Sequence, residues 1–383
     1  MATVNRLRRR YDVIIVGAGI AGCATAIALL QQIPNLSVLL LERSSSVSRP
    51  FRIGETLPPQ TMLLLQQLGL SESFLARGDM AAMGTRSIWG SVQVHEYPFW
   101  FSCYGHGWHI DRTSFDSWMV RHAERAGATV IFGSTLTGTQ NYRHGWRVTV
   151  HRSAASTVTF ETALVVDASG RGSAFCRKLG LRANKLDRLT GIFRFFQDEE
   201  NDTACGDASF TLIESDVAGW WYSARLPQGQ WIAALMTDSD LARDMDVLGE
   251  TGWFKALVNT SFTRTRFEKK TPLSPLQVKP ARSQCLQQFC GPGWYAAGDA
   301  ACVFDPLSSL GIFKALRHGL LASYAIRDEL QGKPDAISKY QHLLESEFKQ
   351  YQHTRRQYYQ LEKRFVQAPF WQRRQQQKHP GGA

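Results

Sequence analysis

The chain has 383 residues, of which 44% are apolar and 20% charged, as is ordinary for a globular protein of one or two domains. No run of about 18 apolar residues occurs, which argues against a membrane-spanning helix, and the basic N-terminus is not followed by the apolar core of a signal peptide. The seven cysteines are scattered without CxxC spacing, so we expect reduced thiols in a cytoplasmic protein.

The net charge of +11 is concentrated at the two ends of the chain. Residues 6–10 carry four arginines, and residues 349–378 carry eight basic side chains against one glutamate, which together account for the whole excess. Because the stretch between them is formally neutral, the charge does not indicate a nucleic-acid groove, and no nucleic-acid partner is expected. We expect solvated ends or, alternatively, a docking surface for an acidic partner.

The first predicted unit is a strand, a helix and a second strand. Tyr11–Val16 is a short β-rich run of the kind that lies buried in a parallel sheet. A helix is expected over about residues 20–32, and the apolar run 36–41 ends in Glu42. Such a βαβ unit is the context in which a glycine-rich turn binds a dinucleotide.

Gly17, Gly19 and Gly22 form a GxGxxG turn between this strand and helix. The first glycine permits the tight turn, the second lets a diphosphate approach the backbone, and the third lets helix and strand pack closely. Glu42, twenty residues past Gly22, is placed to accept hydrogen bonds from ribose hydroxyls. The cofactor-binding residues predicted here are Gly17, Gly19, Ile20, Ala21, Gly22, Glu42 and Arg43. The motif alone leaves NAD and FAD both open.

The rest of the chain mixes helices and strands. Helices are expected at residues 60–68, 113–125, 310–330 and 336–365, and strands at 88–95, 147–150, 163–167 and 294–297, with a turn at 141–145. Residues 189–237 are strand-like and rich in aromatic side chains, which indicates an antiparallel sheet. The Gln/Arg-rich tail after Ala368 is expected to fray.

A second site lies far from the glycine turn. Gly298-Asp299 closes the strand at 294–297, and the segment 305–312 (DPLSSLGI) opens a helix. This pattern resembles the Gly-Asp signature of the FAD monooxygenase and flavin halogenase superfamily. The resemblance implies non-covalent FAD, with Asp299 on its sugar hydroxyls and Pro306, Gly311 and Ile312 against the isoalloxazine ring. A helix N-terminus aimed at that ring would stabilise the negative charge that builds there on reduction.

Two further segments resemble the same superfamily. Residues 52–59 (RIGETLPP) are similar to a segment that straps across the flavin in halogenase-like members, and residues 112–116 (RTSFD) match a helix start whose arginine reaches FAD. Arg52 and Arg112 are therefore expected to bind FAD, with Gly298 and Asp299. The resemblance implies an α/β fold: a Rossmann-like FAD-binding domain, an inserted mixed or antiparallel β-sheet substrate domain, and a C-terminal helical segment. The expected boundaries are 1–185 with 280–330, 186–279 with strands around 86–110, and 331–383.

The flavin chemistry is narrowed by what the sequence lacks. There is no second GxGxxG for a separate NAD(P)H domain, so electrons are expected from NAD(P)H or from a reductase. Halogenases use a lysine soon after the strap-like segment and a Trp-x-Trp-x-Ile-Pro motif, but no lysine precedes Lys178, and residues 220–227 read WWYSARLP. Hydroxylation of an electron-rich aromatic ring is therefore the favoured reaction. Alternatives are a halogenase, a geranylgeranyl-reductase-like oxidoreductase, and an FAD-binding assembly or chaperone partner.

A narrower resemblance concerns the substrate. The segments FRIGETLPP, GWWYSARLP and WYAAGDAACVFDPLSSLGI together look like the flavoproteins that mature oxidases containing cysteine tryptophylquinone. That resemblance implies oxygenation of a tryptophan within a precursor protein, which would be the partner. The predicted catalytic residues are Glu55, Pro306, Ser308 and Ser309, and the predicted substrate contacts are Trp220, Trp221 and Tyr222. No metal site is expected, since His106 and His109 have no carboxylate at ligand spacing.

Overall fold

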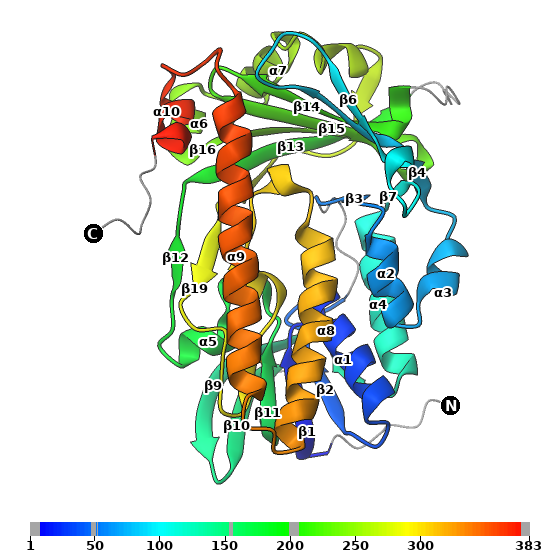
Figure 1. Ribbon diagram of the computed structural model, residues 1–383, viewed down its shortest axis with the longest axis vertical. Helices are drawn as coiled ribbons and strands as arrows, with labels where there is room; N and C mark the ends of the chain where they lie inside the picture. The colour runs from blue at the N-terminus through cyan, green and yellow to red at the C-terminus, as the bar shows by residue number, and fades with distance from the viewer. Residues whose placement is uncertain (1–7, 47–50, 52, 153–155, 199–206, 377–383) are drawn as a thin grey trace.

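The computed structural model describes residues 8–46, 51, 53–152, 156–198 and 207–376. It has two sheets stacked end to end, a parallel sheet below and a largely antiparallel sheet above, with long helices along one side (Figure 1). The predicted α/β fold class is confirmed, including the C-terminal helical segment. The boundaries of the predicted domains stay a prediction.

The parallel sheet has β1 (Arg10–Val16) near its centre, between β2 (Val38–Leu41) and β11 (Ser156–Asp167), with β8 (Thr129–Ile131) and β21 (Trp294–Ala296) outside them. Val16 is paired with Leu41 on one side and with Asp167 on the other, so three strands end at one level. The connections from these strands lead to opposite sides of β1. In an open α/β sheet, a crevice forms at the carboxyl ends of the strands where the strand order reverses in this way. The hairpin of β9 (Ser134–Tyr142) and β10 (Gly145–Arg152) extends β11, as the predicted turn at 141–145 requires.

Helices cover this sheet. α1 (Ile20–Gln32) packs on α8 (Gly311–Leu330), and glycine is needed at the crossing, because a Cβ at Gly319 would lie 2.6 Å from the Cβ of Ala24. α4 (Arg112–Arg125) begins where the Asp111 carboxylate accepts hydrogen bonds from two first-turn amides. Shorter helices are α2 (Thr61–Gln67), α3 (Ser71–Leu75) and α5 (Ala174–Lys178). The long α9 (Ala336–Leu361) lies beside α8 and reaches the upper sheet (Figure 1).

The upper sheet contains the aromatic-rich region. Its order is β17-β13-β16-β15-β14-β5-β6, with β18 also paired to β13. The strands are β5 (Gly84–Ile88), β6 (His95–Pro98), β13 (Leu189–Asp198), β14 (Phe210–Asp216), β15 (Gly219–Arg225), β16 (Gln230–Asp238), β17 (Lys270–Pro272) and β18 (Gln277–Pro280). The predicted antiparallel sheet is confirmed, although β14 and β5 run parallel. The single strand predicted at 88–95 is wrong, since β5 ends at Ile88 and β6 starts at His95.

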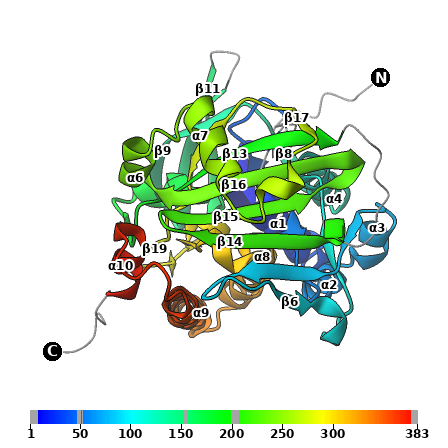
Figure 2. The ribbon, with the colours of Figure 1, turned by 90° about the horizontal axis from the view of Figure 1, so that it is seen from above.

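The two sheets are joined by short strands, and the upper one is capped by helices. β12 (Ala183–Lys185) pairs with β19 (Gln284–Leu286), which pairs with β22 (Cys302–Val303). A second three-stranded sheet holds β3 (Thr56–Leu57), β7 (Gly107–His109) and β4 (Met80–Ala82). Seen from above, α6 (Ser239–Asp244) and α7 (Glu250–Val258) lie over the outer face of the upper sheet (Figure 2). Within the described residues, no helix is long and apolar enough to cross a membrane.

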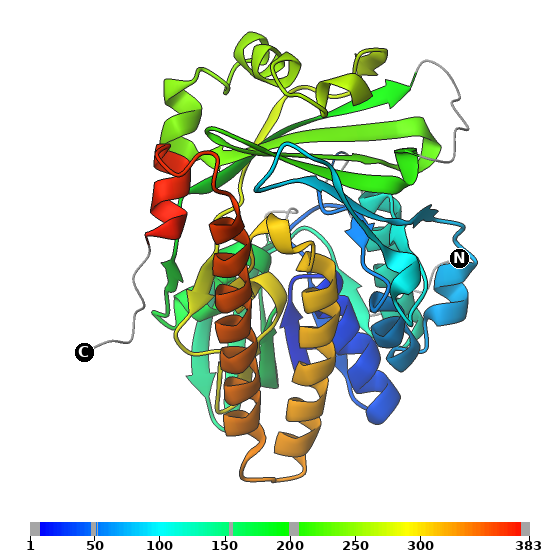
Figure 3. The ribbon, with the colours of Figure 1, turned by 45° about the horizontal axis from the view of Figure 1, so that its top comes forward.

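The C-terminal segment differs from the frayed tail that the sequence predicts. Residues 369–375 form α10 (Pro369–Gln375), which lies at the ends of β14 and β16 in the upper sheet (Figure 3). Phe370 and Trp371 are fully buried, and the Arg374 guanidinium binds the Asp238 carboxylate at 2.7 Å. The prediction was wrong because the apolar pair was hidden among glutamines and arginines. It follows that part of the basic C-terminal charge is used in internal ion pairs and is not free for an acidic partner.

Candidate FAD site and adjoining cavity

The glycine turn is shaped by close backbone contacts. Gly17 has φ +107°, and a Cβ there would lie 2.4 Å from the carbonyl oxygen of Ala168. A Cβ at Gly22 would lie 2.1 Å from the carbonyl oxygen of Gly17, whereas a Cβ at Gly19 would meet no atom within 4 Å. Two glycines therefore serve the packing, and the third faces open space at the start of α1. Among the described residues no side chain caps that helix, so its first amides remain available to an anion such as a diphosphate.

Glu42 follows β2 and lies beside this turn. Its carboxylate accepts hydrogen bonds from the amides of Ala18 at 3.1 Å and Ser44 at 2.9 Å, and it is half-buried. These bonds fix the carboxylate at the carboxyl end of the sheet, where it can also accept bonds from sugar hydroxyls. Arg43 is exposed, while Ile20 and Ala21 are buried in the first turn of α1. Arg52 lies outside the described residues.

Asp299 lies on the loop that leaves β21, opposite the start of α1. Its carboxylate binds the Lys314 ammonium at 2.8 Å and approaches the Arg171 guanidinium at 4.0 Å. Desolvation works to raise the pKa of Asp299, but the charges of Lys314 and Arg171 outweigh it and hold the pKa below its usual range. Gly298 before it has φ +63°, and a Cβ there would lie 2.7 Å from the Cβ of Ala21. The two predicted cofactor motifs are thus in direct contact.

The turn that precedes α8 starts at Asp305, which is buried. Pro306–Ser308 form one 3-10 turn, Ser309 has φ +51° in the left-handed region, and a Cβ at Gly311 would meet no atom within 4 Å. The Ser308 hydroxyl donates to the carbonyl of Asp305 at 2.9 Å, and Ser309 is exposed. As at α1, no side chain in the described part of the chain caps the helix, and Ile312 is buried in its first turn. Two uncapped helix starts with open space before them match the needs of a dinucleotide.

A cavity of about 280 Å³ lies near the start of α4. It lies between the strap, here residues 53–59, the start of α4 and the inner face of the upper sheet. Its lining is Phe51, Glu55, Ile110, Asp111, Arg112, Thr113, Phe195, Leu226, Pro227, Gln228, Gln230 and Leu273. The Arg112 guanidinium donates to the carbonyl of Ile53 at 2.8 Å and binds the Asp116 carboxylate at 3.2 Å, so it fastens the strap to α4.

Glu55 is the polar centre of the cavity wall. It is 1% exposed; its Oε2 accepts a hydrogen bond from the Tyr222 hydroxyl at 3.3 Å, and its Oε1 is buried without a hydrogen-bond partner among the described residues. Burial raises the pKa of Glu55 to about 7, although the Arg112 charge opposes this shift. A carboxyl group with one free oxygen and a pKa near neutrality can accept or hold a proton at physiological pH.

A row of close polar contacts continues behind Glu55. The Thr56 hydroxyl lies 3.3 Å from the Tyr222 hydroxyl and 3.1 Å from Nδ1 of His109. Nε2 of His109 lies 3.3 Å from the carbonyl oxygen of Ser209, and burial lowers the pKa of His109 to about 4. His109 is therefore neutral, donates through Nε2 and accepts from Thr56 through Nδ1. Sequence reasoning did not assign this role, because no local pattern links residues 56, 109 and 222.

The predicted substrate residues divide between the two faces of β15. Trp220 and Tyr222 lie on the inner face, and Trp221 lies on the outer one, buried against Trp253 of α7. The structure therefore does not bring Trp221 together with Glu55. Trp220 is 1% exposed, and its indole donates to the Tyr359 hydroxyl at 3.1 Å, which makes it part of the core above the turn. Tyr222 alone of the three contacts Glu55. Among the described residues, no cluster of three or more His, Cys, Asp or Glu side chains could hold a metal ion.

Comparison with known proteins identifies the family. The sequence model of a protein family described as "FAD binding domain" matches residues 10–343. The chain belongs to the FAD-binding domain family. This FAD-binding protein is 31% identical to LodB of Marinomonas mediterranea, named as an FAD-dependent oxidoreductase, over 95% of this chain and 96% of LodB. The predictions of FAD as cofactor and of an FAD-dependent oxidoreductase are confirmed.

Solved structures show the same fold in other flavoproteins. The chondrochloren halogenase CndH, described as myxobacterial, is 20% identical with a TM-score of 0.86, over 96% of this chain and 86% of that one. QhpG, a peptidyl tryptophan dihydroxylase essential for tryptophylquinone cofactor biogenesis, is 23% identical with a TM-score of 0.75, over 96% of this chain and 79% of that one. The predicted membership of the FAD monooxygenase and flavin halogenase-like superfamily is confirmed. At these identities the likeness extends to the fold and not to the reaction.

Proposed function

We propose that this chain is a monooxygenase that hydroxylates an electron-rich aromatic ring, and that the ring is a tryptophan side chain of a precursor protein of a cysteine tryptophylquinone enzyme. The observation that carries the proposal is the cavity that sets the buried Glu55 carboxyl group in an apolar and aromatic wall. The shared fold with a peptidyl tryptophan dihydroxylase adds support.

The reaction balances with O₂ and two electrons. A ring C–H becomes C–OH, and the second oxygen atom leaves as water with two protons. Bound reduced flavin supplies the electrons and makes O₂ reactive toward electron-rich carbon. We propose NAD(P)H or a reductase as the source of those electrons. The residues of the chain then have three tasks: to hold the ring, to exclude water and to accept the proton that leaves the ring carbon.

The wall of the cavity suits an indole. Phe51 and Phe195 lie with ring centroids 5.3 Å apart, and Leu226 lines the same space. Aromatic and aliphatic contacts of this kind hold a flat ring in a fixed orientation and keep water away. An indole has no group that ionises at neutral pH, so it requires positioning more than activation.

Glu55 is also the proposed proton acceptor. The leaving proton would pass to its free Oε1, while the Tyr222 hydroxyl holds Oε2. A pKa near 7 keeps a substantial fraction of the carboxyl group ionised at neutral pH and lets it release the proton again. Asp111 and Arg112 also line the cavity beside Glu55.

Hydroxylation is favoured over halogenation by the lining itself. The described residues around the cavity include Arg112 but no lysine, so the amine that directs the halogenating agent in halogenases has no counterpart there. This is the same distinction that the sequence predicts from the absence of lysine before Lys178.

The test is mass spectrometry of a precursor protein after incubation with the reduced, FAD-loaded chain, O₂, chloride and bromide. We expect oxygen to be added at one tryptophan, and no addition when that tryptophan is replaced by phenylalanine. The Glu55→Gln variant should bind FAD normally and lose most of the turnover. A halogenated product, or rapid turnover of a free aromatic metabolite without any reaction on the precursor, would overturn the proposal.

A further inference from the structure

Three side chains on one face of α9 converge on a single residue. Tyr351, Arg355 and Tyr359 are spaced by four positions, which places them one above the other on the helix. The Arg355 guanidinium binds Oδ2 of Asp305 at 3.0 Å, and the Tyr359 hydroxyl donates to the same oxygen at 2.9 Å. The Tyr351 hydroxyl accepts from the backbone amide of Asp305 at 2.7 Å. Asp305 is 1% exposed and stands directly before Pro306.

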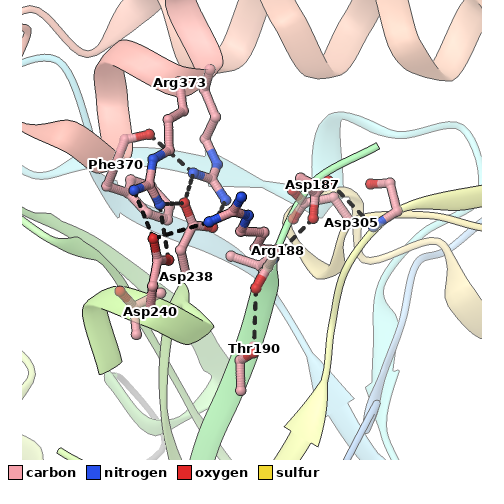
Figure 4. Close-up of polar contacts among 12 residues, drawn as sticks. Asp187, Arg188, Thr190, Asp238, Asp240, Asp305, Phe370 and Arg373 are labelled. Carbon is pink, nitrogen blue, oxygen red and sulfur yellow. Dashed lines mark hydrogen bonds and ion pairs between the residues drawn. The ribbon is translucent and has the colours of Figure 1, made fainter. Parts of the chain in front are cut away.

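The same three side chains also hold the connections to the upper sheet. Arg355 binds the Asp187 carboxylate at 2.8 Å, on the segment between β12 and β13. Asp187 and Asp305 consequently lie side by side (Figure 4). The Tyr351 hydroxyl lies 2.6 Å from the Ser283 hydroxyl on the returning segment, and Tyr359 accepts from the indole of Trp220 on β15. α9 therefore joins the turn before α8 to both crossings between the sheets.

The turn needs such an external hold. Its internal hydrogen bonds are short-range: Asp305 Oδ1 accepts from the amide of Leu307 at 3.0 Å, and Ser308 bonds back to the carbonyl of Asp305. Ser309 adopts φ +51°, a conformation that costs energy for a residue with a side chain. A turn of this kind persists only where its surroundings fix it. Asp305 is the residue through which those surroundings act.

We infer that Tyr351, Arg355 and Tyr359 are positioning residues that act through Asp305 to hold the uncapped start of α8 in place for the flavin. The inference rests on the family assignment and on the proposed position of the flavin ring beside the Pro306–Gly311 turn. Fixed amides at that helix start would stabilise negative charge on the ring, so their displacement should lower both the affinity for FAD and its electron affinity.

A matched control exists on α10. Arg373 binds the Asp238 carboxylate at 2.9 Å and the Asp240 carboxylate at 2.8 Å, and neither carboxylate belongs to the turn before α8 (Figure 4). Its ion pairs join α10 to the end of β16 and to α6. Replacing Arg373 should therefore weaken the packing of α10 while leaving the contacts of Asp305 unchanged.

The experiment compares Arg355→Met, Arg355→Lys, Tyr359→Phe and Arg373→Met in the FAD-loaded chain. The measurements are the dissociation constant of FAD, the visible spectrum, the midpoint potential of the bound flavin, and Tm. We expect Arg355→Met to weaken FAD binding by about tenfold. Its spectrum should change and its potential become more negative. Arg355→Lys should recover part of each effect, and Tyr359→Phe should produce a smaller shift in the same direction.

The control decides between positioning and mere stability. Arg373→Met should lower Tm while leaving the FAD spectrum, potential and affinity as in the unchanged chain. If Arg355→Met does not fold, Tyr359→Phe, which keeps its ring in the core, provides the same test. The inference is overturned if Tyr359→Phe and any folded Arg355 variant bind FAD with unchanged affinity, spectrum and potential. None of these measurements requires turnover, so failure of the proposed hydroxylation would leave this result readable.

Discussion

Glu42 and Glu55 belong to two differently built regions of the molecule. Glu42 ends a strand of the parallel sheet, is half-buried, and has both carboxylate oxygens bonded to nearby amides. Glu55 lies between the two sheets, is 1% exposed, and has one oxygen without a partner among the described residues. The first region is made of residues close in sequence and is ready to bind a ligand. The second region is assembled from segments that are distant in sequence, and it holds the pKa of a carboxyl group at about 7.

Substitutions in the glycine turn should have the largest effect of those considered for the two regions. Gly22→Val should abolish folding of the FAD region. The Cβ of the new side chain would lie 2.1 Å from the carbonyl oxygen of Gly17, which is too close for two atoms that are not bonded. Gly19→Ala should fold with unchanged Tm, since no atom of the described residues lies within 4 Å of the new methyl group, but should bind FAD more weakly. Circular dichroism and FAD titration check both variants. Normal FAD binding by Gly19→Ala would show that no diphosphate approaches this position.

The second region should depend strongly on the C-terminal segment. Trp371 is fully buried and donates to the carbonyl of Asp216 at 2.9 Å. Trp371→Ala should therefore lower the free energy of unfolding by about 3–5 kcal/mol. Urea unfolding checks this, with Gln376→Ala at an exposed position as the control. A loss below about 1 kcal/mol would contradict the packing of α10 and would support the frayed tail that the sequence predicts.

The buried carboxyl group should make stability fall as pH rises. The pKa of Glu55 is raised from 4.5 to about 7 in the folded chain, so between these values the folded state binds more protons than the unfolded state. Its contribution is complete below pH 4.5 and is lost as pH rises through 7. Glu55→Gln should be more stable than the unchanged chain at pH 8 by at most about 3 kcal/mol. Equal unfolding free energies at pH 8, measured in the FAD-free protein, would contradict the shift.

The smallest expected effect concerns the contact between the two cofactor motifs. Asp299→Asn keeps the shape of the side chain but removes the charge that faces Lys314. FAD binding should weaken by about 1–3 kcal/mol through the loss of a charged hydrogen-bond acceptor. Fluorescence titration of FAD measures this. Unchanged affinity would mean that Asp299 serves only its ion pairs with Lys314 and Arg171.

The sequence predicts the first region well and the second only in part. A strand, three glycines and Glu42 lie within 32 residues, so spacing alone reveals the turn. Trp221 has the same sequence context as Tyr222, but the alternation of a strand sends it to the opposite face, beneath α7. Arg355 is one of many basic residues in its segment, and only the path of α9 shows that it meets Asp305 and Asp187. The roles of Trp221 and Arg355 therefore depend on where the fold places them and not on their residue type.

The span of α9 has a consequence for biosynthesis. Residues 17–22 leave the ribosome early and can begin to fold as a βαβ unit, whereas the turn at 305–311 is fastened by residues 351–359, which are made later. Arg355 must also find Asp187, 168 positions earlier in the chain. Contacts over such sequence separations form late. A nascent chain would therefore display its nucleotide-binding end well before it could hold the whole cofactor, and loading with FAD would coincide with completion of the second half of the protein.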